Sequence, residues 1–238
     1  MAGPIPVDAA LNLVEAELKH TTQFPAGASG PTRMLCLQGR FAEARAALSR
    51  TAGQLAERGG RMLPSEAHEV AGNVALMDGD VGEAVRNLQL AYDEKMAAGD
   101  PAGASTTATA LAEAYLESGD LEEAQKYAVH ARETSSRDDF ASQGRSRQIE
   151  ARVLSAQGRH PEAEALAGEA VTIVADTDYL ALHGDALVHL GRVLHAAGKA
   201  DQAVAAANQA AELYQRKGAT FLVDRTRNLA REWAGAPA

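Results

Sequence analysis

Seven histidines and one cysteine are among the side chains of this chain that could ligate a metal or act as nucleophiles. A two-histidine zinc site on a helix places its ligands four residues apart, on one face. No two histidines here have that spacing, and His189 and His195 lie six residues apart. We interpret the histidines as surface or packing residues and expect no metal site. They are His20, His68, His130, His160, His183, His189 and His195.

The single cysteine, Cys36, stands between Leu35 and Leu37. A nucleophilic cysteine needs a basic neighbour or a helix N-terminus to lower its pKa. The apolar surroundings instead favour a buried, unreactive thiol. A lone cysteine also forms neither an internal disulfide nor a cysteine-based zinc site, which fits a reducing compartment.

Motifs for phosphate binding and serine catalysis are incomplete or missing. The nearest approach to a P-loop runs from Gly191 to Gly198, Lys199 and Ala200, with six residues between the glycines. Alanine then stands where a hydroxyl would bind magnesium. No serine lies in a Gly-x-Ser-x-Gly sequence. The chain is therefore predicted to be no enzyme and to need no cofactor.

Charge and hydropathy exclude further classes of protein. The 238 residues include 23 basic and 32 acidic side chains, for a net charge of −9. Nucleic-acid binders are usually basic, because they must neutralise phosphates. No apolar run reaches the roughly 20 residues needed to span a bilayer, and the first residues lack the basic head and apolar stretch of a signal peptide. We expect a cytoplasmic protein with no nucleic-acid partner and no membrane contact.

A five-fold repeat organises the elements that position these side chains. Each copy has an apolar residue four before a glycine, a polar residue after it, and then Glu or Gln next to an alanine. The glycine can end one helix in a left-handed conformation, and the alanine lets the next helix approach closely. The glycines, spaced by 39 or 40 residues, are Gly39, Gly79, Gly119, Gly158 and Gly198, and the alanines are Ala44, Ala84, Ala124, Ala163 and Ala203.

Apolar residues three and four apart within each copy predict amphipathic helices in pairs. Aromatic residues make up only 4% of the chain, which argues against a sandwich or barrel of strands. The expected helices cover 5–19, 32–38, 41–58, 64–78, 81–98, 101–118, 121–135, 138–157, 160–176, 178–197, 200–217 and 220–233.

These features resemble the tetratricopeptide repeat, over roughly residues 31 to 235. The resemblance includes small residues before each turn, namely Gly72, Ala112, Ala151 and Gly191. The period of about 40 is longer than the usual 34, the usual tryptophan and closing proline are missing, and the first copy is irregular. The resemblance implies an all-α fold, a right-handed superhelical solenoid of about five helix-turn-helix repeats.

A narrower resemblance is to the C-terminal repeat region of actinobacterial signalling proteins, namely class III adenylate or guanylate cyclases with an ATPase module, and related transcription regulators. The segments that carry it begin at Asp138 (Asp-Asp-Phe-Ala-Ser-Gln), Asp176 (Asp-Thr-Asp-Tyr) and Leu213 (Leu-Tyr-Gln-Arg-Lys-Gly). This resemblance implies an alternative function, as the regulatory or sensor segment of such a protein. The catalytic and ATPase parts of those relatives have no counterpart in this sequence.

In the repeat family the first helix of each pair lines a concave groove. Spacing from the turn glycines then implies a lining that begins acidic and turns basic at Arg145 and Arg152, although a solvated face with local ion pairs is the alternative. The implied lining is Glu66, Glu69, Asn73, Thr106, Thr109, Glu113, Glu117, Arg145, Gln148, Arg152, Asp185, Arg192, His195, Arg225, Asn228 and Glu232. The residues expected to contact a partner are Glu69, Asn73, Thr109, Glu113, Arg145, Gln148, Arg152, Arg192, His195, Arg225 and Asn228.

The expected organisation is an N-terminal helix within residues 1–20, a flexible link over 21–31, one repeat domain over 32–235 and a disordered tail at 236–238. The expected function is a non-enzymatic scaffold or adaptor that binds a protein or peptide in its groove. The helices at 5–19 and 220–233, as exposed ends of the array, could also pair between copies in a homo-oligomer.

Overall fold

The computed structural model describes residues 5–18, 29–57 and 62–235. Over these ranges the chain forms twelve α-helices and no strand, as the repeat predicts. Their bounds are α1 Val7–Leu18, α2 Ser29–Leu37, α3 Phe41–Glu57, α4 Pro64–Asp78, α5 Val81–Ala97, α6 Pro101–Ser118, α7 Leu121–Thr134, α8 Phe140–Ala156, α9 His160–Ala175, α10 Leu180–Ala196, α11 Ala200–Lys217 and α12 Thr220–Trp233. None of the described helices is both long and apolar enough to cross a membrane.

The predicted corners are confirmed, because all five repeat glycines adopt positive φ angles between 75° and 92°. At Gly79 the backbone N–H donates to Leu76 O, and the N–H of Asp80 donates to Ala75 O. Asp80 is the N-cap residue that precedes α5, and its carboxylate accepts a hydrogen bond from Glu83 N at 2.9 Å. The glycine therefore ends one helix and the aspartate caps the next.

Small residues let helices approach closely, both within a pair and between successive pairs. The five repeat alanines are fully buried. A Cβ atom added to Gly72 would lie 2.6 Å from Leu88 Cγ, and one added to Gly191 would lie 2.7 Å from the ring of Trp233. The prediction that these positions must stay small is therefore confirmed by the close approach of neighbouring helices.

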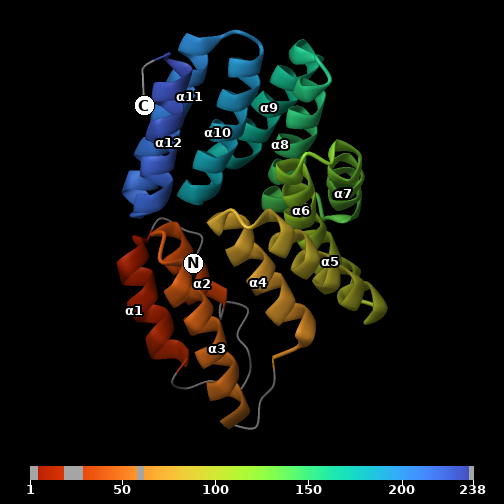
Figure 1. Ribbon diagram of the computed structural model, residues 1–238, viewed down its shortest axis with the longest axis vertical. Helices are drawn as coiled ribbons and strands as arrows, with labels where there is room; N and C mark the ends of the chain where they lie inside the picture. The colour runs from red at the N-terminus through yellow and green to blue at the C-terminus, as the bar shows by residue number, and fades with distance from the viewer. Residues whose placement is uncertain (1–4, 19–28, 58–61, 236–238) are drawn as a thin grey trace.

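Successive pairs stack so that each helix contacts its neighbours along the chain. Figure 1 shows the pairs following one another from α4 to α12 around a curved path. The largest buried cluster joins α4 to α8, through residues that include Leu88, Leu111 and Ile149. A stack of this kind is the helical repeat solenoid that the spacing predicts.

The N-terminal helices close this path. Figure 1 shows α1 and α2 lying on the same side of the molecule as α12, and one buried cluster contains Val7, Met34, Tyr214 and Val223. Lys217 Nζ donates to the carbonyl oxygen of Ile5 at 2.6 Å. The two ends of the array are therefore packed against each other within one chain, whereas the sequence suggested that the first and last helices were exposed ends.

One boundary differs from the prediction by three residues, and the other described boundaries differ by two residues or fewer. The helix expected over 32–38 begins at Ser29, because Pro31 fits within the first turn of a helix. Ser29 to Pro31 thus belong to α2. The rest of the expected link, residues 21–28, and the expected tail at 236–238 lie outside the described residues.

Candidate binding groove and central cavity

Charged side chains from three first helices, α6, α8 and α10, meet in the structure. Arg145 of α8 lies 3.7 Å from Asp185 of α10, and Asp185 accepts a hydrogen bond from the hydroxyl of Tyr214 at 2.6 Å. Burial alone would lower the pKa of Arg145, but Glu113 of α6 and Asp185 raise it. Burial raises the pKa of Glu113. These residues form one electrostatic cluster, contributed by α6, α8, α10 and α11.

A second level of charges lies further along the same helices, four to seven residues toward their C-termini. Arg152 pairs with Glu117 at 2.5 Å. Burial opposes ionisation of Glu117, but the positive charges of Arg152, Arg192 and Arg225 lower its pKa. Burial and the nearby Arg152 lower the pKa of Arg192. Arg152 thus pairs with Glu117, and Arg192 and Arg225 add positive charge near the same carboxylate.

Two buried polar side chains between these levels keep unused hydrogen-bonding atoms. His189 is 8% exposed, and its Nε2 lies 4.0 Å from a carboxylate oxygen of Glu113. Gln148 is 2% exposed. Among the described residues, neither His189 Nδ1 nor Gln148 Nε2 has a hydrogen-bond partner. Burial, followed by the field of Arg152 and Arg192, lowers the pKa of His189 well below 6.5, so the ring is neutral at pH 7.

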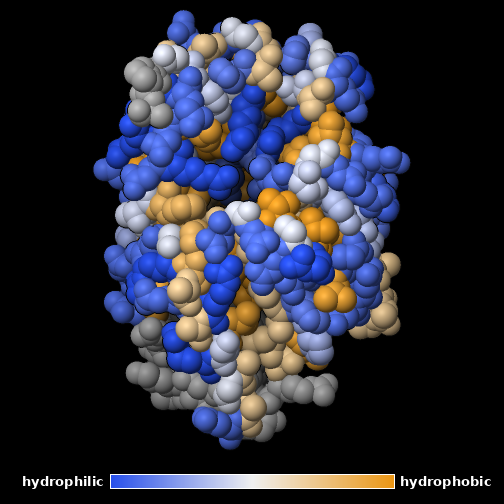
Figure 2. Space-filling view, viewed as in Figure 1, coloured by the Kyte–Doolittle hydropathy of each residue, from blue (hydrophilic) through white to orange (hydrophobic). Residues whose placement is uncertain are grey.

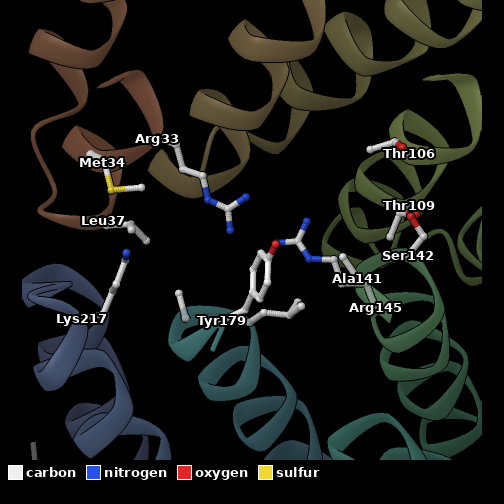
Figure 3. Close-up of a pocket in the computed structure, with 12 residues that line it drawn as sticks. Arg33, Met34, Leu37, Thr106, Thr109, Ala141, Ser142, Arg145, Tyr179 and Lys217 are labelled. Carbon is white, nitrogen blue, oxygen red and sulfur yellow. The ribbon is translucent and has the colours of Figure 1, made fainter. Parts of the chain in front are cut away.

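A cavity of about 170 Å³ lies where α2 faces α6, α8, α10 and α11. Its lining includes Arg33, Arg145 and Lys217 together with Tyr179 and Leu182. Figure 3 shows the guanidinium groups of Arg33 and Arg145 and the hydroxyl of Tyr179 pointing into the same space. In Figure 2 apolar atoms interrupt the mostly hydrophilic surface around a hollow near the middle of this face. This pocket is therefore lined by both cationic and apolar side chains.

Several predicted groove residues come together in these two regions. Arg145 and Thr109 line the cavity, although the Thr109 hydroxyl donates to the carbonyl oxygen of Ser105 in its own helix. Arg225 is an exposed residue of α12. Its positive charge also lowers the pKa of Glu117 and of His189. The predicted residues in these regions are Thr109, Glu113, Arg145, Gln148, Arg152, Arg192 and Arg225.

Other predicted residues make contacts elsewhere. Glu69 accepts a hydrogen bond from Lys95 Nζ at 2.7 Å, in a network between α4, α5 and α6. Asn73 donates to the carbonyl oxygen of Glu69 within α4. His195 stacks on Trp233, with ring centroids 5.6 Å apart. Asn228 is exposed and accepts a hydrogen bond from Arg231.

The sequence prediction missed Arg33 and Tyr214, and it interpreted His189 only as a surface or packing residue. Arg33 lies on α2, outside the regular repeats from which the lining was derived. Tyr214 comes from a second helix and reaches inward across Gly184, where an added Cβ would lie 2.6 Å from its ring. The sequence did contain a signal for Tyr214. Gly184 lies 40 residues after Gly144, at the equivalent position of the next repeat, and a glycine that recurs inside a helix indicates that a neighbouring side chain packs closely against it.

The remaining reactive candidate is inert. Cys36 is 1% exposed, and burial raises its pKa to about 11. The expected buried thiol is confirmed. Within the described residues no group of three or more His, Cys, Asp or Glu side chains is placed to hold a metal ion.

Comparisons with known proteins agree with this architecture. Models of the tetratricopeptide repeat match residues 105–125 and 146–216. No curated protein matches the sequence. Among solved structures, NprR in complex with its cognate peptide NprX has a TM-score of 0.70 at 15% identity, with 95% of this chain and 69% of that chain covered.

Two further structures share the fold at low identity. The thermophilic tetratricopeptide-repeat protein TTC0263 of Thermus thermophilus has a TM-score of 0.55 at 19% identity, with 84% of this chain and 98% of that chain covered. BtubC from P. vanneervenii has a TM-score of 0.55 at 16% identity, with 87% of each chain covered. Together with the repeat corners, these likenesses show that the chain folds as a helical repeat solenoid, and that two of its segments are similar to the tetratricopeptide repeat.

Proposed function

We propose that this chain is a non-enzymatic scaffold or adaptor that binds an acidic segment of a protein or peptide in its concave groove. The observation that carries the proposal is the second charge level, where Arg152, Arg192 and Arg225 act on the single carboxylate of Glu117. This local excess of positive charge occurs in a chain with a net charge of −9. Arginine suits the recognition of carboxylates, because its planar fork can donate two parallel hydrogen bonds.

The fold supports the proposal in a general way. Solenoids of stacked helical pairs offer extended concave surfaces, and the similar NprR structure holds a peptide. The cytoplasm remains the expected compartment, because the lone cysteine suits a reducing environment.

A direct test compares a fluorescent peptide rich in Asp and Glu with the same peptide carrying Asn and Gln. The acidic peptide should bind the intact chain, and its affinity should fall as salt is added. The double variant Arg192→Gln/Arg225→Gln should weaken binding at least tenfold without changing the helical circular-dichroism signal. Arg137→Gln, at an exposed residue of the turn between α7 and α8, is the matched control and should bind normally.

Equal binding of the acidic and neutral peptides would contradict the charge-based proposal. Unchanged binding by the double variant would contradict the assignment of this groove level. Turnover of any substrate by the purified chain alone would contradict a purely non-enzymatic role.

A second candidate is a regulatory or sensor segment of a nucleotide-cyclase, ATPase or transcription-regulating protein. Only the sensor role in this candidate has a counterpart among the comparisons, in the apo form of the quorum sensor NprR from B. thuringiensis, with a TM-score of 0.57 at 15% identity over 95% of this chain and 65% of that chain. A neighbouring or fused reading frame for a cyclase, an ATPase or a DNA-binding domain would favour this candidate. Without such a frame, the stand-alone adaptor is favoured.

A further inference from the structure

The cavity beside α2 has a charge that its own lining does not balance. Its lining contains three cationic side chains, Arg33, Arg145 and Lys217, and no acidic one. The carboxylates of Asp185, 3.7 Å from Arg145, and of Glu113 lie outside the lining and partly compensate Arg33 and Arg145. Lys217 has its own contacts, which include the carbonyl oxygen of Ile5. Like charges held in one enclosed space repel each other more strongly than in water. An anion in the cavity would relieve that repulsion.

Arg33 is the member of this group that is most available to a ligand. It makes no hydrogen bond or ion pair with another described side chain. Its surroundings lower its pKa, first through burial and then through the charge of Arg145. Its residue surface is nevertheless exposed, and Figure 3 shows its guanidinium directed into the cavity. The group therefore has free donors at a place that solvent and small molecules can reach.

The rest of the lining restricts what kind of anion fits. Met34, Leu37 and Leu182 contribute apolar surface, and Tyr179 contributes an aromatic ring. The volume of about 170 Å³ is below the range of about 300–1,000 Å³ common for drug-sized ligands. A fully hydrated inorganic anion would leave the apolar wall unused, whereas a carboxylate with a short aliphatic group would cover it.

We propose that this cavity binds a small aliphatic carboxylate, with Arg33 and Arg145 as its charge partners and the side chains of Met34, Leu37 and Leu182 against its tail. The carboxylate could belong to a free small acid or to the C-terminal residue of a peptide. This site is separate from the groove level at Arg192 and Arg225, and it uses a residue of α2 that lies outside the regular repeats.

The location gives the ligand a structural consequence. Arg33 lies on α2 and Arg145 on α8, so a bound carboxylate links the N-terminal helices to the middle of the solenoid. The same N-terminal helices pack on α11 and α12 through Val7, Met34 and Tyr214. A ligand that binds only the closed arrangement stabilises it by mass action. Carboxylate binding should therefore protect α1 and α2 from local opening.

The test is isothermal titration of the full chain with hexanoate, hexanamide and inorganic phosphate. Hexanoate should bind, and hexanamide, which lacks the charge, and phosphate, which lacks the tail, should each bind at least tenfold more weakly. Arg33→Gln should weaken hexanoate binding at least tenfold while keeping normal helicity. Arg192→Gln/Arg225→Gln should leave hexanoate binding unchanged, which separates this site from the proposed peptide groove.

Two further arms distinguish the source of the carboxylate and test the link. A short peptide ending in leucine, with a free or an amidated C-terminus, shows whether a peptide end is accepted. Binding of the free form alone indicates a peptide source, and binding of hexanoate alone indicates a free acid. Hydrogen exchange in α1 and α2 should slow when hexanoate is added. Equal binding of hexanoate and hexanamide, equal binding of hexanoate and phosphate, or unchanged binding by Arg33→Gln would overturn the proposal.

Discussion

Phe41 at the start of α3 and Phe221 at the start of α12 meet edge to face, with ring centroids 5.1 Å apart and planes at 89°. Phe221 also covers Gly39, where an added Cβ would lie 3.1 Å from the ring. The first corner of the repeat array is thus in contact with its last helix. In an open solenoid each unit contacts only its neighbours, so this pair distinguishes a closed path from an open one.

The aromatic pair predicts how the closed path comes apart. Phe221→Ala should destabilise the chain by about 2 kcal/mol, because it removes apolar area and an edge-to-face contact. Hydrogen exchange should accelerate in α1 and α2 as well as in α12. The control Phe140→Ala removes another aromatic pair, Phe140 with Tyr179, and should accelerate exchange in α8 and α10 instead. An exchange change confined to α12 in Phe221→Ala would show that closure contributes nothing.

The repeat explains why so much of the fold could be predicted. A glycine at a turn between helices and an alanine at a helix–helix contact meet local requirements. Residues such as Gly79 and Ala84 therefore predict the local structure from the sequence alone. Closure could not be predicted in the same way. Lys217 donates to a backbone oxygen of Ile5, a group that every residue has, and no sequence spacing indicates it.

The candidate site was predictable only in its periodic part. Arg145 and Arg152 lie at fixed distances from a turn glycine, and the structure places each in an ion pair between first helices. Arg33 follows an irregular segment, so no register could place it. Glu69 is the opposite case, because it was predicted to contact a partner but is paired within the chain. Lys95, from the second helix of the pair, forms an ion pair with it, and the position of Glu69 in the repeat does not indicate this.

A second prediction concerns the close approach at Gly72. Gly72→Ala should destabilise the chain by about 1–3 kcal/mol, because the new methyl group would overlap Leu88. This cost should exceed the gain of about 1 kcal/mol in helix propensity. Gly168→Ala is the matched helical control, since nothing lies within 4 Å of its added Cβ, and it should be stabilising. Urea denaturation of both variants measures the contrast, and equal stabilities would refute the packing argument.

A third prediction assigns Glu69 a structural role. Lys95 Nζ donates to Glu69 at 2.7 Å and to Thr107 Oγ1 at 2.9 Å, and Thr107 in turn donates to Glu69. The side chains of Lys95 and Glu69 are only 11% and 23% exposed. Lys95→Met should therefore cost about 2 kcal/mol, because it leaves a largely buried carboxylate without its cation. Glu69→Gln should reduce the free energy of unfolding less in the Lys95→Met variant than in the wild type. Strict additivity of the two substitutions in a double-mutant cycle would show that the pair is not coupled.

A fourth prediction concerns the reactivity of Cys36. Burial raises its pKa to about 11, so the thiolate is scarce at neutral pH and reagents cannot reach it. Iodoacetamide at pH 8 should label the native chain far more slowly than the chain in urea. A native rate close to that of the unfolded chain would mean that α2 opens frequently. Phe221→Ala should increase the native rate, because it loosens the contact that holds the N-terminal helices.

A fifth prediction follows from the buried ring of His189. Its pKa in the folded chain is held well below 6.5 by burial and by nearby arginines. As the pH falls below 6.5, the unfolded chain binds a proton that the folded chain rejects, so the free energy of unfolding decreases. Between about pH 7 and about pH 5.5 this single group should cost about 1 kcal/mol.

His189→Gln should remove that part of the pH dependence, since glutamine keeps a polar side chain but does not titrate. Urea denaturation at several pH values measures the difference between wild type and variant. Glu113, whose pKa is raised by burial, acts in the opposite direction, because the folded chain holds its proton to higher pH than the unfolded chain. Glu113→Gln should therefore steepen the loss of stability on acidification, and parallel pH profiles for wild type and His189→Gln would contradict the assignment of a neutral buried ring.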